Sequence, residues 1–227
     1  MIRFPDNLIQ LEFDTINLDM HRPLLFVTKC SNLQEFVLIS HGFYNSKGLP
    51  HVTLPRLRIL KFPCHYPDRQ DLTEYLKIHG RNLKELWVWD DSLNPIIAEF
   101  CPNLKSLCTA FGHVESLKEL LNGCQQLERL KSNEYLLSRG ELLQTVAKHS
   151  PENFQELKLY NHSELFPDEL ESFFMSWSNR MPRKSLSLIF IWFGSEKGVT
   201  KVIEKFKRLG VVKKFEIIRF DESNYDQ

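Results

Sequence analysis

The sequence predicts an α/β fold in which short strands alternate with helices and stack along a single axis. Three observations lead to this prediction. The phrase L-x-x-L-x-L, or a close variant of it, recurs along the whole chain. Its copies follow one another at a near-regular spacing. The segments between the copies carry apolar residues at helical spacing, and several of them begin with residues that favour a helix start.

The repeated phrase predicts the strands. Its nine central residues lie 21 to 29 residues apart, and they are Leu11, Phe36, Leu60, Leu86, Leu107, Leu130, Leu157, Leu186 and Phe215. This period is typical of leucine-rich repeats. Because alternate residues of a strand face the same side, the two closing apolar residues of each phrase should point into the stack.

The segments between the phrases predict the helices. Their apolar residues at helical spacing are, in chain order, Leu72, Tyr75 and Leu76; Leu117, Leu120 and Leu121; Leu142, Leu143 and Val146; and Phe173, Phe174 and Trp177. The last, aromatic group is expected in the core under the helix layer or in a C-terminal cap.

Three of these segments carry helix-start signals. Asn94 precedes Pro95 and is expected to cap the helix that begins there. The pairs Ser138 with Glu141 and Asp168 with Glu171 each fit the capping box, in which two side chains bond the free backbone N–H groups of a helix start.

Together these elements predict a right-handed leucine-rich-repeat solenoid of about nine repeats, with a parallel sheet on the concave face and helices on the convex face. It would span residues 1–220, ahead of an acidic, polar tail at residues 221–227. The first phrase begins at Leu8 with few residues ahead of it to form a polar cap. We therefore expect the chain to be part of something longer.

Composition narrows the class of protein. Of the 227 residues, 42% are hydrophobic and 26% are charged, and Lys plus Arg equals Asp plus Glu at 29 each. A neutral chain lacks the positive field that nucleic-acid binding needs. No apolar run approaches the roughly 18 residues of a membrane span, and no secretory signal is visible. We expect a cytoplasmic or nuclear protein that binds neither nucleic acid nor membrane.

The five cysteines are expected to be reduced thiols, because their number is odd and no signal peptide is visible. Their spacing fits no metal motif, so we expect no metal and no cofactor. Cys30, Cys101 and Cys124 each lie just ahead of a strand phrase and are expected to be small buried residues. Cys108 and His113 could suggest a nucleophile and its base, but nothing orients them, so we expect no enzymatic activity.

Three stretches, residues 116–128, 141–159 and 169–188, resemble the repeats of a large family of fungal F-box/leucine-rich-repeat proteins. The resemblance extends from about residue 30 to residue 218. It implies a solenoid that holds the substrate of a cullin-type ubiquitin ligase, while an N-terminal F-box docks the ligase adaptor. The sequence itself contains no F-box. The adaptor is therefore expected as a partner only if an F-box lies upstream, and the alternative is a stand-alone repeat scaffold or inhibitor with no ubiquitin-ligase link.

An unknown target protein is expected on the concave face, which the residues beside each inward pair would line. The candidate contact residues are Ile59, Lys61, Trp87, Trp89, Arg129, Lys131, Lys158 and Tyr160. Trp87 and Trp89 are the leading candidates, because aromatic residues often anchor protein interfaces. The alternative is that they pack against lysine stems such as Lys61 and stabilise the face. Arg129 and Lys131 could pair with an acidic group of the target, or could form an ordinary solvated strand.

Overall fold

The structure is a computed structural model, and it describes residues 7–14, 24–39, 49–63, 67–135, 137–161, 166–180, 184–192 and 198–219. The tail predicted at residues 221–227 lies outside the described residues, and so does Cys64. Among the helices that the structure describes, none is long and apolar enough to span a membrane.

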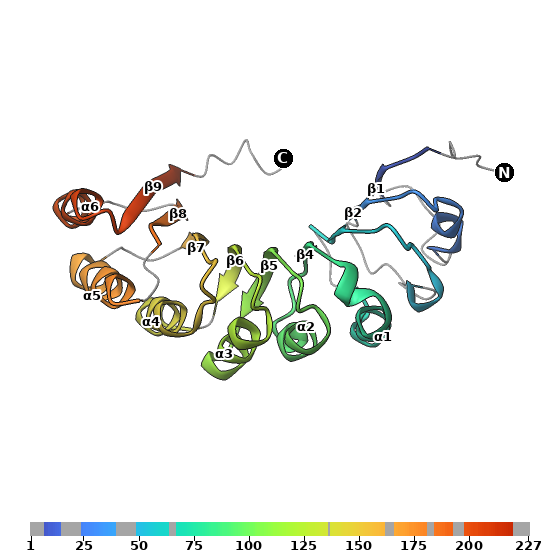
Figure 1. Ribbon diagram of the computed structural model, residues 1–227, viewed down its shortest axis with the longest axis horizontal. Helices are drawn as coiled ribbons and strands as arrows, with labels where there is room; N and C mark the ends of the chain where they lie inside the picture. Colours follow the sequence, from blue (N-terminus) through green and yellow to red (C-terminus); the bar gives the residue numbers. More distant parts are fainter. Residues whose placement is uncertain are drawn as a thin grey trace.

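The described residues contain nine strands, which form one parallel sheet in the order of the sequence. The strands are β1 (Gln10–Asp14), β2 (Glu35–Ile39), β3 (Ile59–Lys61), β4 (Glu85–Trp87), β5 (Ser106–Phe111), β6 (Arg129–Tyr135), β7 (Glu156–Asn161), β8 (Leu186–Trp192) and β9 (Val212–Arg219). The chain follows an arc, with the strands on its inner side and the helices on its outer side (Figure 1). The predicted α/β class and the parallel sheet are confirmed.

Neighbouring strands are aligned so that the central residues of the phrases lie side by side. From β1 to β7 each predicted central residue pairs in register with the next one. On β8, however, the residue in register with Leu157 and Phe215 is Leu188, so the prediction of Leu186 was wrong. The pairing of β8 with β9 shifts between Leu186 and Ser187, and a shift of this kind leaves no signal in a spacing of leucines.

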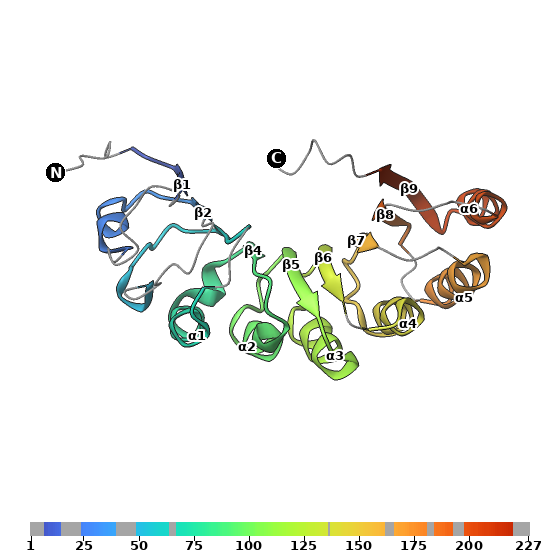
Figure 2. The same cartoon turned by 180° about the vertical axis from the view of Figure 1, so that it is seen from behind.

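The α-helices form an outer layer that alternates with the strands (Figure 2). They are α1 (Arg69–His79), α2 (Asn94–Phe100), α3 (Val114–Gly123), α4 (Arg139–His149), α5 (Pro167–Ser178) and α6 (Val199–Arg208). In the first two connections the described residues form short 3₁₀ helices instead, η1 (Leu24–Lys29) and η2 (Leu49–His51).

Of the three predicted helix starts, one is confirmed. Ser138 and Glu141 form a capping box at the start of α4. The second box is absent, because α5 begins at Pro167 with Phe166 at the cap position, so Asp168 lies inside the first turn of the helix. Proline suits that first position, since it has no N–H to leave unpaired, and the charge of Asp168 suits the positive end of the helix dipole.

Asn94 is not a cap, which corrects the third prediction. Its side chain is buried, donates to the carbonyl of Ala110 at 3.1 Å and accepts from the hydroxyl of Thr109 at 2.9 Å. Asp90 instead caps the short 3₁₀ helix η4 (Asp91–Leu93) that leads into α2, because its carboxylate accepts from the N–H of Ser92 at 2.9 Å. Asn94 therefore joins α2 to β5.

The core lies between the sheet and the helix layer, and it contains the inward residues of the phrases together with Phe173, Phe174 and Trp177. The predicted burial of Cys30, Cys101 and Cys124 is confirmed. In each of these repeats the carbonyl of the cysteine accepts from the N–H of the leucine three residues later, at 3.0 to 3.2 Å. The three cysteines therefore close equivalent turns, where a small apolar side chain fits between neighbouring repeats.

Candidate functional site

The inner face of the sheet carries rows of side chains that run across the strands. The residues just before each central residue form the first row, which is Gln10, Glu35, Ile59, Glu85, Ser106, Arg129, Glu156, Ser187 and Lys214. The residues just after it form the middle row, which is Glu12, Val37, Lys61, Trp87, Cys108, Lys131, Lys158, Ile189 and Glu216.

Near the centre of the middle row, the ring of Trp87 contacts two lysines of the same row, Lys61 and Lys131. Trp87 is half-buried, and the ammonium of Lys61 lies 5.0 Å from its ring centre. The ammonium of Lys131 lies 4.3 Å from the same ring centre. Both distances are typical of cation–π contacts, which stabilise a lysine on an aromatic face. Trp87 therefore contacts the ammonium groups of two lysines and is half-buried on the inner face.

Lys61 has acidic partners. Its ammonium lies 3.1 Å from a carboxylate oxygen of Glu35 and 3.1 Å from one of Glu85. Burial disfavours the charge of Lys61, but the hydrogen bonds to Glu85 and Glu35, together with the negative charges of these two carboxylates, outweigh that effect and raise its pKa. The register brings this triad together, because both glutamates belong to the first row on the strands that flank β3.

Lys131 has a different environment. Its ammonium lies over Trp87 and also 5.4 Å from the ring centre of Tyr160. Burial lowers the pKa of Lys131, and the positive charges of Lys158 and Lys61 lower it further. Among the described ion pairs, none includes Lys131 or Lys158.

Trp89, two residues beyond Trp87, is half-buried. Its indole nitrogen is enclosed, and no acceptor among the described residues bonds to it. An enclosed donor without an acceptor is unusual in folded proteins and destabilises the folded state. Trp89 therefore combines some exposure of its ring with an unsatisfied N–H group.

Cys108 lies in the middle row but is closed off from solvent. Burial raises the pKa of its thiol to about 11. His113 is exposed and lies at the start of α3, where its side chain makes no capping bond. Since the thiolate is the reactive form of cysteine, the environment of Cys108 opposes the role of nucleophile.

The structure brings together four of the eight predicted contact residues, namely Lys61, Trp87, Lys131 and Tyr160, which we call the lysine–aromatic cluster. Lys158 pairs in register with Lys131. Ile59 lies between Glu35 and Glu85 in the first row, Arg129 is exposed two residues before Lys131, and Trp89 lies beyond Trp87. Glu35 and Glu85 were not among the eight candidate contact residues, although the register of the phrases places both on the inner face beside Lys61.

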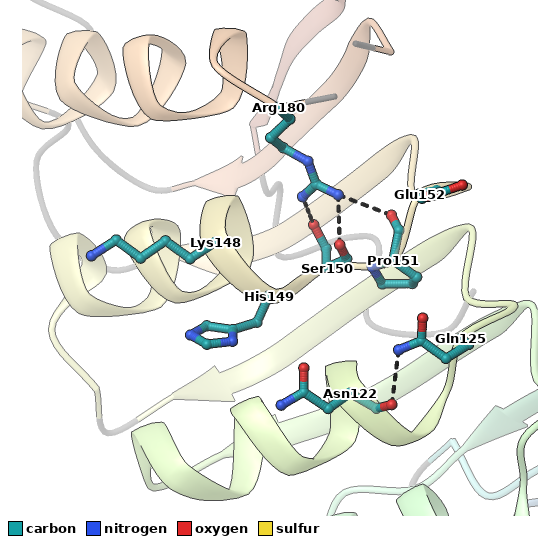
Figure 3. Close-up of a pocket in the computed structure, with 8 residues that line it drawn as sticks. All are labelled: Asn122, Gln125, Lys148, His149, Ser150, Pro151, Glu152 and Arg180. Carbon is teal, nitrogen blue, oxygen red and sulfur yellow. Dashed lines mark hydrogen bonds between the residues drawn. The ribbon is translucent and has the colours of Figure 1, made fainter. Parts of the chain in front are cut away.

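A second feature, on the helix side, was not predicted. An open hollow of about 400 Å³ lies at the carboxyl ends of α3 and α4, lined by Asn122, Gln125, Lys148, His149, Ser150, Pro151, Glu152 and Arg180 (Figure 3). The guanidinium of Arg180 donates to the carbonyls of Ser150 and Pro151, at 2.5 and 3.0 Å, and to the hydroxyl of Ser150. Arg180 thus adds a charged donor to the turn that ends α4, which is a structural role.

The protein-family models include none that matches this chain, and the curated proteins include none either.

Proposed function

We propose that this chain is a protein-binding solenoid of the leucine-rich-repeat type that holds a target protein on its inner face. The observation that carries the proposal is the lysine–aromatic cluster on a broad sheet face that the α-helices leave open. Aromatic and cationic side chains on an accessible face are frequent anchors of protein interfaces. The near-regular phrase and the in-register parallel strands support the leucine-rich-repeat assignment.

Within this proposal, we favour the substrate-recognition part of an F-box subunit of a cullin-type ubiquitin ligase, because the repeats resemble that family. The alternative is a stand-alone scaffold or inhibitor with no ligase link. Neither activity needs a catalytic residue, a metal or a cofactor, and both fit a cytoplasmic or nuclear protein.

A photo-crosslinking experiment tests the binding face. A photoreactive amino acid replaces Ser106, which lies in the first row of the inner face, or, as a matched control, the exposed Glu119 on the neighbouring helix α3. The captured protein is identified by mass spectrometry and purified, and its Kd is measured with the unlabelled chain. We expect capture from position 106 and not from position 119, and a Kd about ten-fold weaker for Trp87→Ala. Capture from the helix layer alone would contradict the proposal.

A second experiment separates the two readings. The purified ligase adaptor is presented to the chain and to the chain extended by the residues encoded upstream of Met1. The ligase reading predicts that only the extended chain binds. If neither form binds the adaptor, the stand-alone scaffold or inhibitor is the correct reading.

A further inference from the structure

We infer that Lys131 and Lys158 form a binding site for carboxylates, and that they receive an acidic segment of the partner protein. This inference rests on the proposed function and specifies the chemistry of the partner. It is carried by the register of β6 and β7, which places two lysines opposite each other on the inner face.

The juxtaposition is unfavourable in the free protein. Lys131 and Lys158 are directly paired in the parallel ladder, and both are half-buried. Neighbouring strands lie roughly 4.8 Å apart, so the two stems start close together. Like charges directly opposite each other destabilise a sheet. Residues that destabilise the local structure are expected at functional sites, so the lysine pair is a candidate binding site.

The two other lysines in the rows of the inner face have carboxylate partners within the chain. Lys61 lies between Glu35 and Glu85. Lys214 pairs with Glu216 at 2.6 Å. Among the described residues, Lys131 and Lys158 form no ion pair. Two acidic groups act on Lys131: the buried thiol of Cys108, whose pKa is raised to about 11, and Glu85, which already bonds Lys61. The lysine pair therefore differs from the two other lysines of these rows, each of which has a carboxylate partner within the chain.

The surroundings of the pair favour a carboxylate on a protein segment. An ammonium group acts as a point charge and attracts carboxylates and phosphates alike, so the groups beside the lysines decide between them. Trp87 and Tyr160 flank Lys131 and hold its ammonium in place. Their half-buried rings also provide apolar surface for the residues next to an Asp or Glu. An extended segment that crosses the rows would place carboxylates on the lysines and apolar side chains on the rings.

Isothermal titration calorimetry with a hexaglutamate peptide tests the inference. The wild-type chain should bind hexaglutamate, more weakly as the salt concentration rises, and should not bind hexaglutamine. Lys131→Gln and Lys158→Gln should each weaken binding by about ten-fold. Lys201→Gln is the matched control, because it removes the same charge from an exposed position on α6 and should leave binding unchanged.

A charge-reversal variant guards against effects on folding. In the double variant Lys131→Glu, Lys158→Glu, preference should switch from hexaglutamate to hexalysine, provided that near-ultraviolet circular dichroism shows an intact fold. Inability of the wild type to bind hexaglutamate at millimolar concentration would overturn the inference, as would equal binding by the Lys→Gln variants. Inorganic phosphate or a phosphoserine peptide that binds the lysines more tightly than hexaglutamate would replace carboxylate by phosphate as the ligand.

Two further measurements separate this inference from the proposed function. If the partner captured from position 106 binds the Lys131→Gln, Lys158→Gln double variant as tightly as the wild type, the carboxylate site is wrong while the binding face stands. If no partner is captured from the inner face, the proposed function itself is wrong. Sedimentation that shows self-association lost in the double variant would identify the occupant as a second copy of the chain and would overturn the assignment to a separate partner.

Discussion

The guanidinium of Arg180 lies over the ring of Trp177, 4.3 Å from its centre. Trp177 lies in α5, and Arg180 follows two residues after the end of that helix. The same guanidinium donates to the carbonyls of Val146 and Ala147 in α4. It also donates to the carbonyl of Ser150, the C-cap residue of α4 (Figure 3). Burial lowers the pKa of Arg180 without depriving it of its charge at neutral pH. One side chain therefore links two successive repeats on the helix side.

We predict that Arg180→Ala lowers the free energy of unfolding by about 2–3 kcal/mol, because several carbonyls lose a charged donor and Trp177 loses its cation. The stability of Arg180→Lys should lie between those of the wild type and of Arg180→Ala. An ammonium keeps the charge but lacks the planar fork that reaches several acceptors. Urea unfolding measures both. Arg208→Ala, at an exposed residue of α6, is the control and should change stability by less than about 0.5 kcal/mol. Equal effects at the two arginines would contradict the prediction.

Trp89→Phe should leave stability unchanged or raise it by up to about 1 kcal/mol. The substitution keeps an aromatic ring and removes an enclosed N–H that has no acceptor among the described residues. Trp177→Phe is the matched comparison, because the indole N–H of Trp177 donates to the carbonyl of Lys184 at 2.8 Å. That variant should lose about 1–2 kcal/mol in urea unfolding. A larger loss at Trp89 than at Trp177 would show that the N–H of Trp89 has a partner.

Asn94→Ala should cost about 2 kcal/mol, because it leaves the hydroxyl of Thr109 and the carbonyl of Ala110 without their buried partner. Thr109→Val removes only the hydroxyl. The double variant Asn94→Ala, Thr109→Val should lose less stability than the sum of the losses in the two single variants. A coupling energy of about 0.5–1 kcal/mol in this cycle would confirm the bond between the two side chains. Strict additivity would contradict it.

The strands could be predicted from the sequence because each phrase carries its own signal. In most phrases an inward leucine or phenylalanine is followed by a second apolar residue two positions later, which predicts a strand and the side of it that faces the core. The spacing of the phrases predicts the order of the strands in the sheet. The eighth strand shows the limit of this reasoning. Its run of apolar residues offers Leu186 and Leu188 as equally good centres, and only pairing with the neighbouring strands selects Leu188.

The helix starts and the site were harder to predict, for a different reason. Asn94 has the residue type of a cap, but a carbonyl and a hydroxyl on β5 bind its amide instead. Similarly, the sequence places Lys61 and Lys131 in the same row without indicating that one has two carboxylates and the other has two rings. The partners of these side chains belong to neighbouring repeats, and local sequence patterns carry no information about contacts between repeats.

Lys158→Gln should raise the free energy of unfolding by a few tenths of a kcal/mol up to about 1 kcal/mol, because it removes a like charge opposite Lys131. It should also raise the pKa of Lys131, since the charge of Lys158 is one of the causes that depress it. Thermal unfolding measures the first effect and NMR titration of ¹³C-methylated lysines the second. Lys201→Gln serves again as the control with the same change in net charge. A destabilised Lys158→Gln variant would show that Lys158 has a stabilising partner in the free protein.

Stability should decline when the pH rises above about 9, under reducing conditions. The usual pKa of a cysteine thiol is 9.0, and burial raises it to about 11 for Cys108 and about 12 for Cys124, and also raises it for Cys101. A raised folded-state pKa means that the stabilising contribution is complete below pH 9 and is lost as the pH climbs through the folded-state value, because the unfolded thiols ionise first. At pH 10 each such thiol should cost about 1 kcal/mol. Lys131, with its lowered pKa, acts in the opposite direction. Urea unfolding between pH 7 and pH 10.5 should show the decline, and Cys108→Ala should make it shallower. A pH dependence that is the same in wild type and in Cys108→Ala would contradict the contribution assigned to the thiol of Cys108.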